Sequence, residues 1–308
     1  MNILIIDYVD PLLTQLLDSN QIPYTYSPDT NRKEVLNIIS QYDGLIVRNK
    51  LQINEAFLLQ AQNLKFIARY GSGMESINVP IAAELGITCF NSAEGNCNSV
   101  AEHAIGMLLS LYHNINNSME DMRQGQWNRE KHRGIELEGK TIGIIGYGNT
   151  GSAFSKKLIG FNCSVLSYDK YKTNFKNEYT DECNMDQLFN TADIISLHIP
   201  LSKETNHLIN LDFINKMKKP FYLINTSRGN VVNTNDLIIA LKDKKILGAC
   251  LDVIENESSA FNKIKLDDNF NYLLNCKNII LTPHIAGLSK QSNLKLANVL
   301  VDKIIKLT

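Results

Sequence analysis

Short apolar runs recur along the N-terminal part of the chain. They cover residues 3–6, 44–47, 65–68 and 87–89, and amphipathic segments separate them. Runs of this length with helical patterns between them predict β-strands that are connected by helices. Strands connected in this way lie parallel and are covered by helices on both faces, so the pattern predicts a buried parallel sheet.

A second series of apolar runs follows a longer helical pattern over residues 99–122. Asn98 and Ser99 are the expected caps of that helix, and Glu102 lies in its first turn. The second series covers residues 141–146, 165–168, 194–197, 222–224, 247–251 and 279–281. Six such runs, with helices between most of them, predict a doubly wound dinucleotide-binding domain.

The two series predict an α/β protein with two doubly wound parallel-sheet domains. The segment over residues 289–306 is amphipathic and too short to fold alone, so we expect it to pack back on the first domain. The first domain is then discontinuous, with residues 1–98 and 285–308, and the second domain, with residues 99–284, is inserted in it. The Asn-rich, charged stretch 256–271 is expected to be a long loop with a functional role.

Composition places the chain among ordinary globular proteins. It has 308 residues, of which 44% are hydrophobic, and 31 basic against 32 acidic residues give a net charge of −1. This length favours two domains. Because no run of basic residues is present, nothing favours binding to nucleic acid or to an anionic membrane. We therefore expect a small-molecule substrate.

The sequence also carries no signal for export or membrane insertion. Asp7 interrupts the first apolar stretch and no basic residue precedes it, which predicts a buried strand and not a signal peptide. No apolar stretch is long enough to span a bilayer. The six cysteines form no CxxC pair and have no histidine at metal-ligand spacing. We expect a cytoplasmic protein with reduced thiols and no metal.

The hexapeptide over residues 146–151 fits the GxGxxG pattern, with Gly146, Gly148 and Gly151 at the glycine positions. It directly follows an apolar strand and opens a helical pattern. Glycines at these positions allow a tight turn and the close approach of a pyrophosphate to the N–H groups of the helix N-terminus. The hexapeptide therefore predicts a dinucleotide site.

An acidic residue at the end of the next strand strengthens this interpretation. Asp169 stands eighteen residues after Gly151 (169 − 151), close to the spacing expected for the acid that binds the ribose hydroxyl. A carboxylate there repels the additional phosphate of NADP, so NAD is the predicted cofactor. Lys170 and Lys172, which lie beside it, work against that preference.

Three segments at predicted strand ends of the second domain carry polar groups suited to hydride transfer. They are NTSRG at 225–229, LDVIENE at 251–257 and TPHIAG at 282–287, and a doubly wound sheet binds ligands beyond the carboxyl ends of its strands. The chemistry needs a cation to hold a carboxylate and polarise the reacting oxygen, and a base to accept the hydroxyl proton. Arg228 and His284 suit these roles.

Glu257 is the candidate partner of His284. A histidine with a pKa near 6.5 accepts a proton at neutral pH, and a carboxylate beside it orients the ring and favours its charged form. Taken singly, each of Arg228, Glu257 and His284 is as easily a surface or structural residue. Their occurrence together at neighbouring strand ends favours the catalytic interpretation.

With these residues in view, the chain resembles the D-isomer-specific 2-hydroxyacid dehydrogenases over nearly its whole length. The segments that carry the resemblance are VRN at 47–49, RYGSG at 69–73, SVAEH at 99–103, GQW followed by ELEGKTIGIIGYG, NTSRG, LDV with Glu257, and TPH. The resemblance implies a catalytic set of Arg228, Glu257 and His284. It also implies a flavodoxin-like substrate domain beside a Rossmann NAD-binding domain, and a homodimer built through the cofactor domains.

The resemblance further implies which residues surround the ligands. Those expected around NAD, in addition to the glycines and Asp169, are Ser72, Asn149, Thr150, Ile199, Thr226, Asp252 and Gly287. Asp252 is expected near the carboxamide of the nicotinamide. The substrate carboxylate is expected to meet Arg228 and the backbone N–H groups of Ser72 and Gly73.

Within the family the chain is most similar to the phosphoglycerate dehydrogenases, especially over residues 122–146. Arg48 and Arg69 follow predicted strands of the first domain, where charge-assisted bonds to a phosphate are possible. Arg129 or Lys131, in one subunit or its partner, is a candidate for a further cation. The predicted reaction is the conversion of 3-phosphoglycerate to 3-phosphohydroxypyruvate, which belongs to serine biosynthesis.

Two other functions stay open. The first is a reductase of glyoxylate or hydroxypyruvate, or a D-lactate-type dehydrogenase, but such substrates leave two inward cations unpaired. The second is an NAD-sensing binding module without catalysis, which turnover of any 2-hydroxy acid would exclude. Because the sequence ends at residue 308, we also expect no C-terminal regulatory domain and no feedback by serine.

The chain departs from the family pattern at several positions. Glu75 and Asn78 stand where aspartates are usual, and Asn149 and Thr150 replace an Arg-Ile pair in the phosphate turn. Ser258 replaces the proline that normally follows the catalytic glutamate, so the loop that carries this glutamate is expected to be less rigid. None of these changes removes a group that the chemistry requires.

Overall fold

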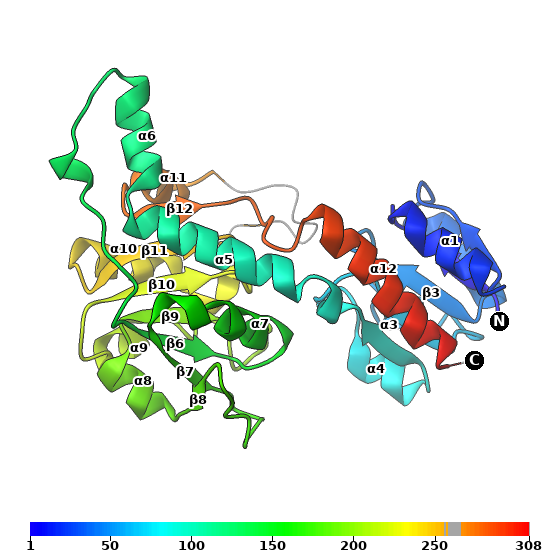
Figure 1. Ribbon diagram of the computed structural model, residues 1–308. Helices are drawn as coiled ribbons and strands as arrows, with labels where there is room; N and C mark the ends of the chain where they lie inside the picture. The colour runs from blue at the N-terminus through cyan, green and yellow to red at the C-terminus, as the bar shows by residue number, and fades with distance from the viewer. Residues whose placement is uncertain (256, 258–265, 308) are drawn as a thin grey trace. The chain divides into compact units, whose positions relative to one another are not determined.

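The computed structural model describes residues 1–255, 257 and 266–307 (Figure 1). The chain divides into two compact units. Unit 1 comprises Met1–Cys97 and Leu288–Thr308, and unit 2 comprises Asn98–Gly287. Each unit has an α/β architecture in which every strand pairing is parallel, which confirms the predicted fold class.

Among its described residues, unit 1 contains one five-stranded sheet in the order β2-β1-β3-β4-β5. The strands are β1 (Ile3–Ile5), β2 (Tyr24–Tyr26), β3 (Gly44–Val47), β4 (Phe66–Arg69) and β5 (Thr88–Asn91). The four predicted runs correspond to β1, β3, β4 and β5. β2 was not predicted, because its sequence Tyr-Thr-Tyr is short, lies at the sheet edge and contains no run of aliphatic residues.

Helices bury both faces of this sheet. They are α1 (Pro11–Ser19), α2 (Arg32–Ile38), η1 (Ile39–Gln41), α3 (Glu55–Leu58), α4 (Val79–Glu84), η2 (Ala93–Gly95) and α12 (Lys290–Ile305). Side chains alternate along each strand, so Ile3 and Ile5 face a cluster with α1 and α12, whereas Leu4 faces a cluster with α2 and α3. Both clusters are almost fully buried.

The C-terminal helix α12 packs on unit 1, as the sequence analysis predicted. Ser289 is its N-cap and accepts a hydrogen bond from the backbone N–H of Ser292 at 3.0 Å. Leu296 and Leu300 are buried against the sheet. Gly95 allows this close packing, because a Cβ atom there would lie 2.6 Å from the backbone nitrogen of Leu296.

Over the described part of unit 2, seven strands form one sheet in the order β12-β11-β10-β9-β6-β7-β8. They are β6 (Thr141–Ile145), β7 (Ser164–Tyr168), β8 (Asp181–Glu182), β9 (Ile194–Leu197), β10 (Phe221–Asn225), β11 (Ile246–Leu251) and β12 (Ile279–Leu281). The six predicted runs are all strands, whereas β8 consists of two acidic residues and gives no apolar signal. The strand order reverses between β6 and β9, where an open α/β sheet forms its ligand crevice.

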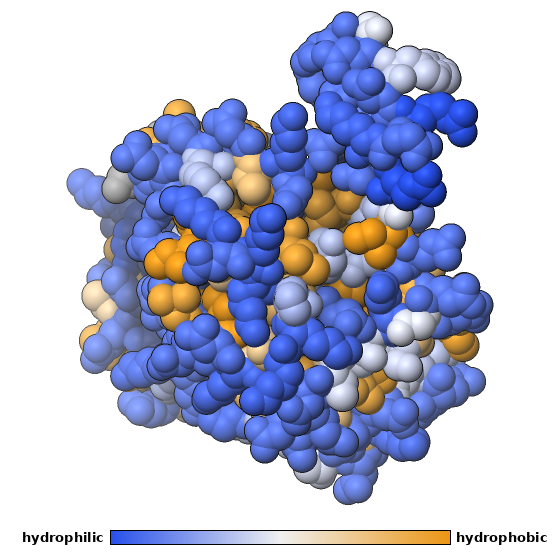
Figure 2. Space-filling model, turned by 90° about the vertical axis from the view of Figure 1, so that its left-hand side faces the viewer, coloured by the Kyte–Doolittle hydropathy of each residue, from blue (hydrophilic) through white to orange (hydrophobic). Residues whose placement is uncertain are grey.

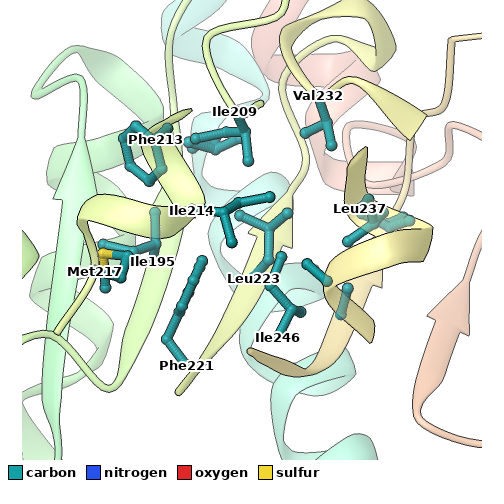
Figure 3. Packing of buried hydrophobic residues seen from close by; sticks show 14 of the residues in the cluster. Ile195, Ile209, Phe213, Ile214, Met217, Phe221, Leu223, Val232, Leu237 and Ile246 are labelled. Carbon is teal, nitrogen blue, oxygen red and sulfur yellow. The ribbon is translucent and has the colours of Figure 1, made fainter. Parts of the chain in front are cut away.

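The helices of unit 2 cover both faces of its sheet, except α6 and η3, which stand apart from it. They are α5 (Cys97–Tyr112), α6 (Ile115–Arg123), η3 (Glu130–His132), α7 (Asn149–Lys157), η4 (Ile159–Phe161), α8 (Met185–Thr191), α9 (Leu211–Lys216), η5 (Gly229–Val231), α10 (Thr234–Lys242) and α11 (Asp268–Asn275). Phe213 and Leu237 pack with Leu223 of β10 on one face (Figure 3). Leu108 and Phe154 pack with Ile144 of β6 on the other.

Two predicted elements were wrong. The single helix over residues 99–122 is interrupted, because Asn114 adopts a left-handed conformation (φ 53°) between α5 and α6, which asparagine tolerates. Since α5 begins at Cys97, Asn98 and Ser99 lie inside the helix and do not cap it.

The loop predicted over residues 256–271 is also shorter than expected. Asp267 accepts a hydrogen bond from the N–H of Phe270 and caps α11, which begins at Asp268. The remainder of that stretch lies largely outside the described residues.

An arm stands out from the rest of unit 2, formed by α6 and residues 124–132 (Figures 1 and 2). Asp121 of α6 holds the returning chain, because its Oδ2 atom lies 2.7 Å from Lys131 Nζ and 2.8 Å from His132 Nε2. Along the part of the chain that is described, no helix combines the length and the apolar character that crossing a bilayer requires.

Candidate active site

The turn between β6 and α7, which was predicted to bind a dinucleotide phosphate, is built on glycines. Gly146 has a positive φ of 93°, and a Cβ atom there would lie 2.4 Å from the carbonyl oxygen of His198. A Cβ atom on Gly151 would lie 2.1 Å from the carbonyl oxygen of Gly146. Neither position can hold a side chain, so the glycines make the turn tight enough for the helix to begin directly behind the strand.

Gly148 differs from the other two glycines, because no atom lies within 4 Å of the position of its Cβ. It is the N-cap residue of α7, and Asn149 and Thr150 are the first helical residues. A glycine cap has no side chain to bond to the first N–H groups of the helix, and those groups attract anions. Ile199 lies beside this turn, since a Cβ atom on Gly146 would be 2.7 Å from its Cγ2 atom.

Asp169 directly follows β7 and is fixed by backbone N–H groups. Its Oδ2 atom accepts from Tyr147 at 2.8 Å, and its Oδ1 atom accepts from Tyr171 at 2.9 Å and Lys172 at 3.0 Å. Burial by itself raises the pKa of this carboxyl group, but the three hydrogen bonds and the charge of Lys172 outweigh it and hold the pKa below the ordinary value. Asp169 is therefore ionised near neutral pH.

The two lysines beside Asp169 each have another partner. Lys170 Nζ lies 2.5 Å from Glu204 Oε2, and Lys172 Nζ donates to the carbonyl oxygen of Tyr147 at 3.0 Å. These contacts oppose the recruitment of either cation to an additional phosphate. The local electrostatics at the end of β7 thus agree with NAD more than the sequence alone indicated.

His284 and Glu257, predicted as a pair from the sequence, are in direct contact. His284 Nδ1 lies 2.6 Å from Glu257 Oε2, and the exposed fractions of the two side chains are 24% and 16%. The other carboxylate oxygen, Oε1, accepts the backbone N–H of Ile254 at 2.6 Å. His284 has a positive φ of 55° and donates its own N–H to the carbonyl oxygen of Asp252 at 2.8 Å.

Arg228 stands on the loop after β10, next to the loop that carries Glu257. Its Nη1 atom donates to the carbonyl oxygen of Ser227 at 2.7 Å, and its own carbonyl oxygen accepts from Asn225 Nδ2 at 2.9 Å. A Cβ atom on the following Gly229 would lie only 2.0 Å from the carbonyl oxygen of Ile254. The loops after β10 and β11 are therefore in close contact.

Asp252, expected near the nicotinamide carboxamide, organises the turn after His284. It is 1% exposed, and its carboxylate accepts the N–H of Ile285 at 2.9 Å, the N–H of Ala286 at 2.8 Å and the hydroxyl of Thr282 at 2.5 Å. This turn closes at Gly287, the last residue of unit 2. A role of Asp252 towards the cofactor stays a prediction.

Two further polar groups lie in this region. The hydroxyl of Thr226 is buried and has no hydrogen-bond partner within the described structure. His103 contacts the hydroxyl of Thr282 through Nε2 at 3.0 Å and lies 3.6 Å from Asp252. In the sequence His103 stands at the end of the SVAEH motif, and no role was predicted for it.

In unit 1, the two predicted phosphate ligands lie around Tyr70. The guanidinium of Arg48 lies 5.4 Å from the centre of the Tyr70 ring. Arg69 is only 5% exposed, and it donates to the carbonyl oxygen of Tyr70 at 2.8 Å and to the side chain of Asn49. These two bonds hold the loops after β3 and β4 together.

The substrate loop of unit 1 is fixed by polar contacts. Ser72 donates its hydroxyl to Asn96 at 2.7 Å, and its carbonyl oxygen accepts from Asn91 at 2.7 Å. Gly73 follows in the same half-buried loop. Among the further cations considered, Lys131 is paired with Asp121 on the arm of unit 2.

The site combines a doubly wound sheet and its glycine turn with an ionised carboxylate after β7 and a histidine–glutamate pair at the strand ends. This combination is typical of a dinucleotide-dependent oxidoreductase. A family model described as D-isomer specific 2-hydroxyacid dehydrogenase, NAD binding domain, matches residues 105–286. The chain therefore belongs to this family and is an NAD-dependent D-2-hydroxyacid dehydrogenase.

Known relatives agree with this assignment. The chain is similar to a hydroxypyruvate reductase from Thermotoga maritima, with 34% identity over 302 residues that cover 97% of this chain and 96% of the relative. It is 30% identical over 309 residues to a D-3-phosphoglycerate dehydrogenase from Archaeoglobus fulgidus. The aligned segment covers 100% of this chain but 57% of that longer relative.

The fold has also been seen in a solved structure. A D-lactate dehydrogenase from Treponema pallidum superimposes with a TM-score of 0.82 at 26% identity, over 100% of this chain and 96% of that one. The relatives differ in the acids for which they are named, so the family is shown and the substrate is not.

Proposed function

We propose that Arg228, Glu257 and His284 carry the interconversion of a D-2-hydroxy acid and the corresponding 2-keto acid. The observation that supports this assignment is the 2.6 Å contact between His284 Nδ1 and Glu257 Oε2. A carboxylate at Nδ1 holds the proton on that nitrogen, orients the ring and leaves Nε2 for proton transfer with the substrate.

In the reductive direction, the guanidinium of Arg228 binds the substrate carboxylate and polarises the keto group. His284 then donates a proton to the substrate oxygen, and Glu257 stabilises the charged imidazolium before the transfer. In the oxidative direction His284 accepts the hydroxyl proton. Ser72 and Gly73 are proposed to assist with backbone N–H groups at the substrate carboxylate.

The residues present fit a bound NAD. The open face at Gly148, the N-terminus of α7, the ionised Asp169 and the buried hydroxyl of Thr226 would hold its phosphates, ribose and nicotinamide ends. Bound there, the nicotinamide supplies or accepts the hydride. Asn149, Ile199, Asp252 and Gly287 are proposed to complete this surface.

For the substrate we propose 3-phosphoglycerate and 3-phosphohydroxypyruvate, with Arg48 as the main phosphate ligand and Arg69 in a supporting role. What supports this choice is the placement of two guanidinium groups around Tyr70 in unit 1. Such an enzyme would serve serine biosynthesis.

A second candidate is the reduction of hydroxypyruvate, which lacks the phosphate. It is favoured by the burial of Arg69 and by the hydroxypyruvate reductase relative, whose length the chain covers at 96%.

Rates of NADH oxidation with 3-phosphohydroxypyruvate, hydroxypyruvate and glyoxylate distinguish the two candidates. For the phosphorylated acid we expect a kcat/KM at least about a hundredfold higher, which corresponds to about 2.7 kcal/mol. Arg48→Ala should reduce that preference about tenfold or more and leave the kcat/KM with hydroxypyruvate unchanged. Arg32→Ala, a control in the same unit, should leave the preference unchanged. Comparable rates for all three acids would support the second candidate and refute the phosphate site.

We also propose that the chain forms a homodimer through unit 2, in which the arm contacts the partner. Ile115, Met119 and Met122 lie on one side of α6 by their spacing, and each is about half exposed, while Trp127 is 75% exposed. Light scattering should give a dimer mass, and Met119→Asp with Trp127→Glu should give a monomer. A monomeric wild-type protein would contradict this.

A cytoplasmic location is proposed from the scattered spacing of the six cysteines, which form no CxxC pair.

A further inference from the structure

A second histidine–carboxylate pair lies outside the catalytic set. Glu255 Oε1 lies 2.5 Å from His207 Nε2, and Glu255 Oε2 accepts the backbone N–H of Thr234, also at 2.5 Å. The side chains are partly exposed, with 38% for His207 and 21% for Glu255. Both oxygens of this carboxylate are therefore used within unit 2.

These contacts join three connections at the carboxyl ends of neighbouring strands. His207 lies between β9 and α9, Thr234 is the first residue of α10 after β10, and Glu255 follows β11. His207 also donates its backbone N–H to the carbonyl oxygen of Asn230 at 2.7 Å. A carboxylate at the N-terminus of α10 is further stabilised by the helix dipole, so Glu255 is a firm attachment for its loop.

The attached loop is the one that carries Glu257. Glu255 stands between Ile254, whose N–H binds Glu257 Oε1 at 2.6 Å, and Glu257 itself, whose Oε2 atom contacts His284. Ile254 is in turn packed on Gly229, where no side chain would fit. A displacement of residues 254 and 255 would therefore move the N–H group that fixes the Glu257 carboxylate.

We propose that Glu255, through its bonds to His207 and to the N-terminus of α10, is a positioning residue that sets the orientation of Glu257 towards His284. This inference rests on the proposed roles of Glu257 and His284. When this attachment is lost, we expect Glu257 to be misplaced and the chemical step to be slower, while NADH and the keto acid still bind.

The test compares Glu255→Ala, Glu255→Gln and wild type in the reduction of the keto acid that wild type reduces fastest. For Glu255→Ala we expect kcat to fall about 10-fold to 100-fold, as small displacements of catalytic groups do, with KM and the dissociation constant of NADH within about twofold. Glu255→Gln should recover part of the rate, because its amide oxygen can still accept from Thr234.

A deuterium isotope effect separates positioning from a general loss of structure. With NADH deuterated at the transferred position, the isotope effect on kcat should rise in Glu255→Ala, because the chemical step becomes rate-limiting. Glu182→Gln is the matched control: Glu182 also accepts a backbone N–H, from Phe175 at 3.1 Å, but lies in β8 at the other edge of the sheet. Its rate and isotope effect should equal those of wild type.

The inference is wrong if Glu255→Ala keeps the wild-type kcat, or if its rate falls only in proportion to the folded fraction. If Glu255→Ala does not fold, His207→Ala removes one of the two attachments and should show a smaller fall in kcat with the same rise in isotope effect. His284→Asn tests the underlying function separately, since an active His284→Asn would refute the catalytic pair. An inactive His284→Asn beside a fully active Glu255→Ala would refute only the positioning role.

Discussion

Replacing Asp252 should show how strongly one buried carboxylate holds the turn that carries His284. Three donors depend on this group, namely the N–H groups of Ile285 and Ala286 and the hydroxyl of Thr282, and the side chain is 1% exposed. In Asp252→Asn, one carboxylate oxygen becomes an NH₂ group that faces a donor. At least one hydrogen bond is lost and one buried donor is left without an acceptor.

A buried donor without an acceptor costs about 1–3 kcal/mol. We therefore expect Asp252→Asn to lower the free energy of unfolding by about 1–3 kcal/mol, and Asp252→Ala, which deprives all three donors, by about 4 kcal/mol or more. Since a domain is stable by only about 5–15 kcal/mol, the alanine variant should be partly unfolded or poorly soluble.

Urea unfolding followed by circular dichroism measures this difference. Circular dichroism is preferable because Trp127, the only tryptophan, is 75% exposed and reports little on the interior. The control is Asp243→Asn, an exposed aspartate after α10, which should change stability by less than about 0.5 kcal/mol. An unchanged unfolding midpoint for Asp252→Asn would refute the assignment of these hydrogen bonds.

The remaining predictions concern the cofactor turn, Asp169 and the core of unit 1. Gly151→Ala should abolish NADH binding measured by fluorescence or prevent folding, because its Cβ atom would lie 2.1 Å from a carbonyl oxygen, and normal binding would contradict the tight turn. Asp169→Ser combined with Glu204→Gln should raise kcat/KM with NADPH about tenfold or more relative to NADH, because the second change releases Lys170 from its ion pair. An unchanged ratio would mean that Asp169 does not face the ribose. The folded pKa of Asp169 is depressed, so its stabilising contribution is complete above its unfolded pKa of about 3.9 and is lost as the pH falls through the folded pKa. In urea unfolding, Asp169→Asn should therefore be less stable than wild type at neutral pH, and the gap should close in acid; a constant gap would count against this. Leu300→Ala should destabilise unit 1 by about 2–5 kcal/mol, and a loss below about 1 kcal/mol would show that α12 packs loosely.

The parts of the fold that the sequence predicted are those with a repeated apolar signal. β1, for example, is a continuous run of buried aliphatic residues, so it was found with nearly correct limits. β2 and β8 were missed because short edge strands are stabilised by backbone pairing and need few apolar side chains. The break at Asn114 was missed because one left-handed residue does not disturb the apolar pattern on either side.

The contacts of the candidate site were also predictable only in part. His284 and Glu257 were paired in advance because both follow predicted strands of one sheet, and parallel strands bring their carboxyl ends together. The contacts of Asp252 with Ile285 and Ala286, and of Glu255 with His207, could not be predicted in this way. They depend on the paths of the loops, which strand positions do not determine. The burial of Arg69 was also missed, because an arginine at a strand end gives no sign of its exposure.

His284 is proposed to transfer the proton in an NAD-dependent reduction of a 2-keto acid. The most direct test is the kcat of NADH oxidation by His284→Asn beside wild type, with the best of the three keto acids and with NADH binding measured on both proteins. We predict that the variant binds NADH normally and that its kcat falls by about 10² to 10⁴, the usual contribution of a general acid. A fall of only a few fold would contradict the assignment.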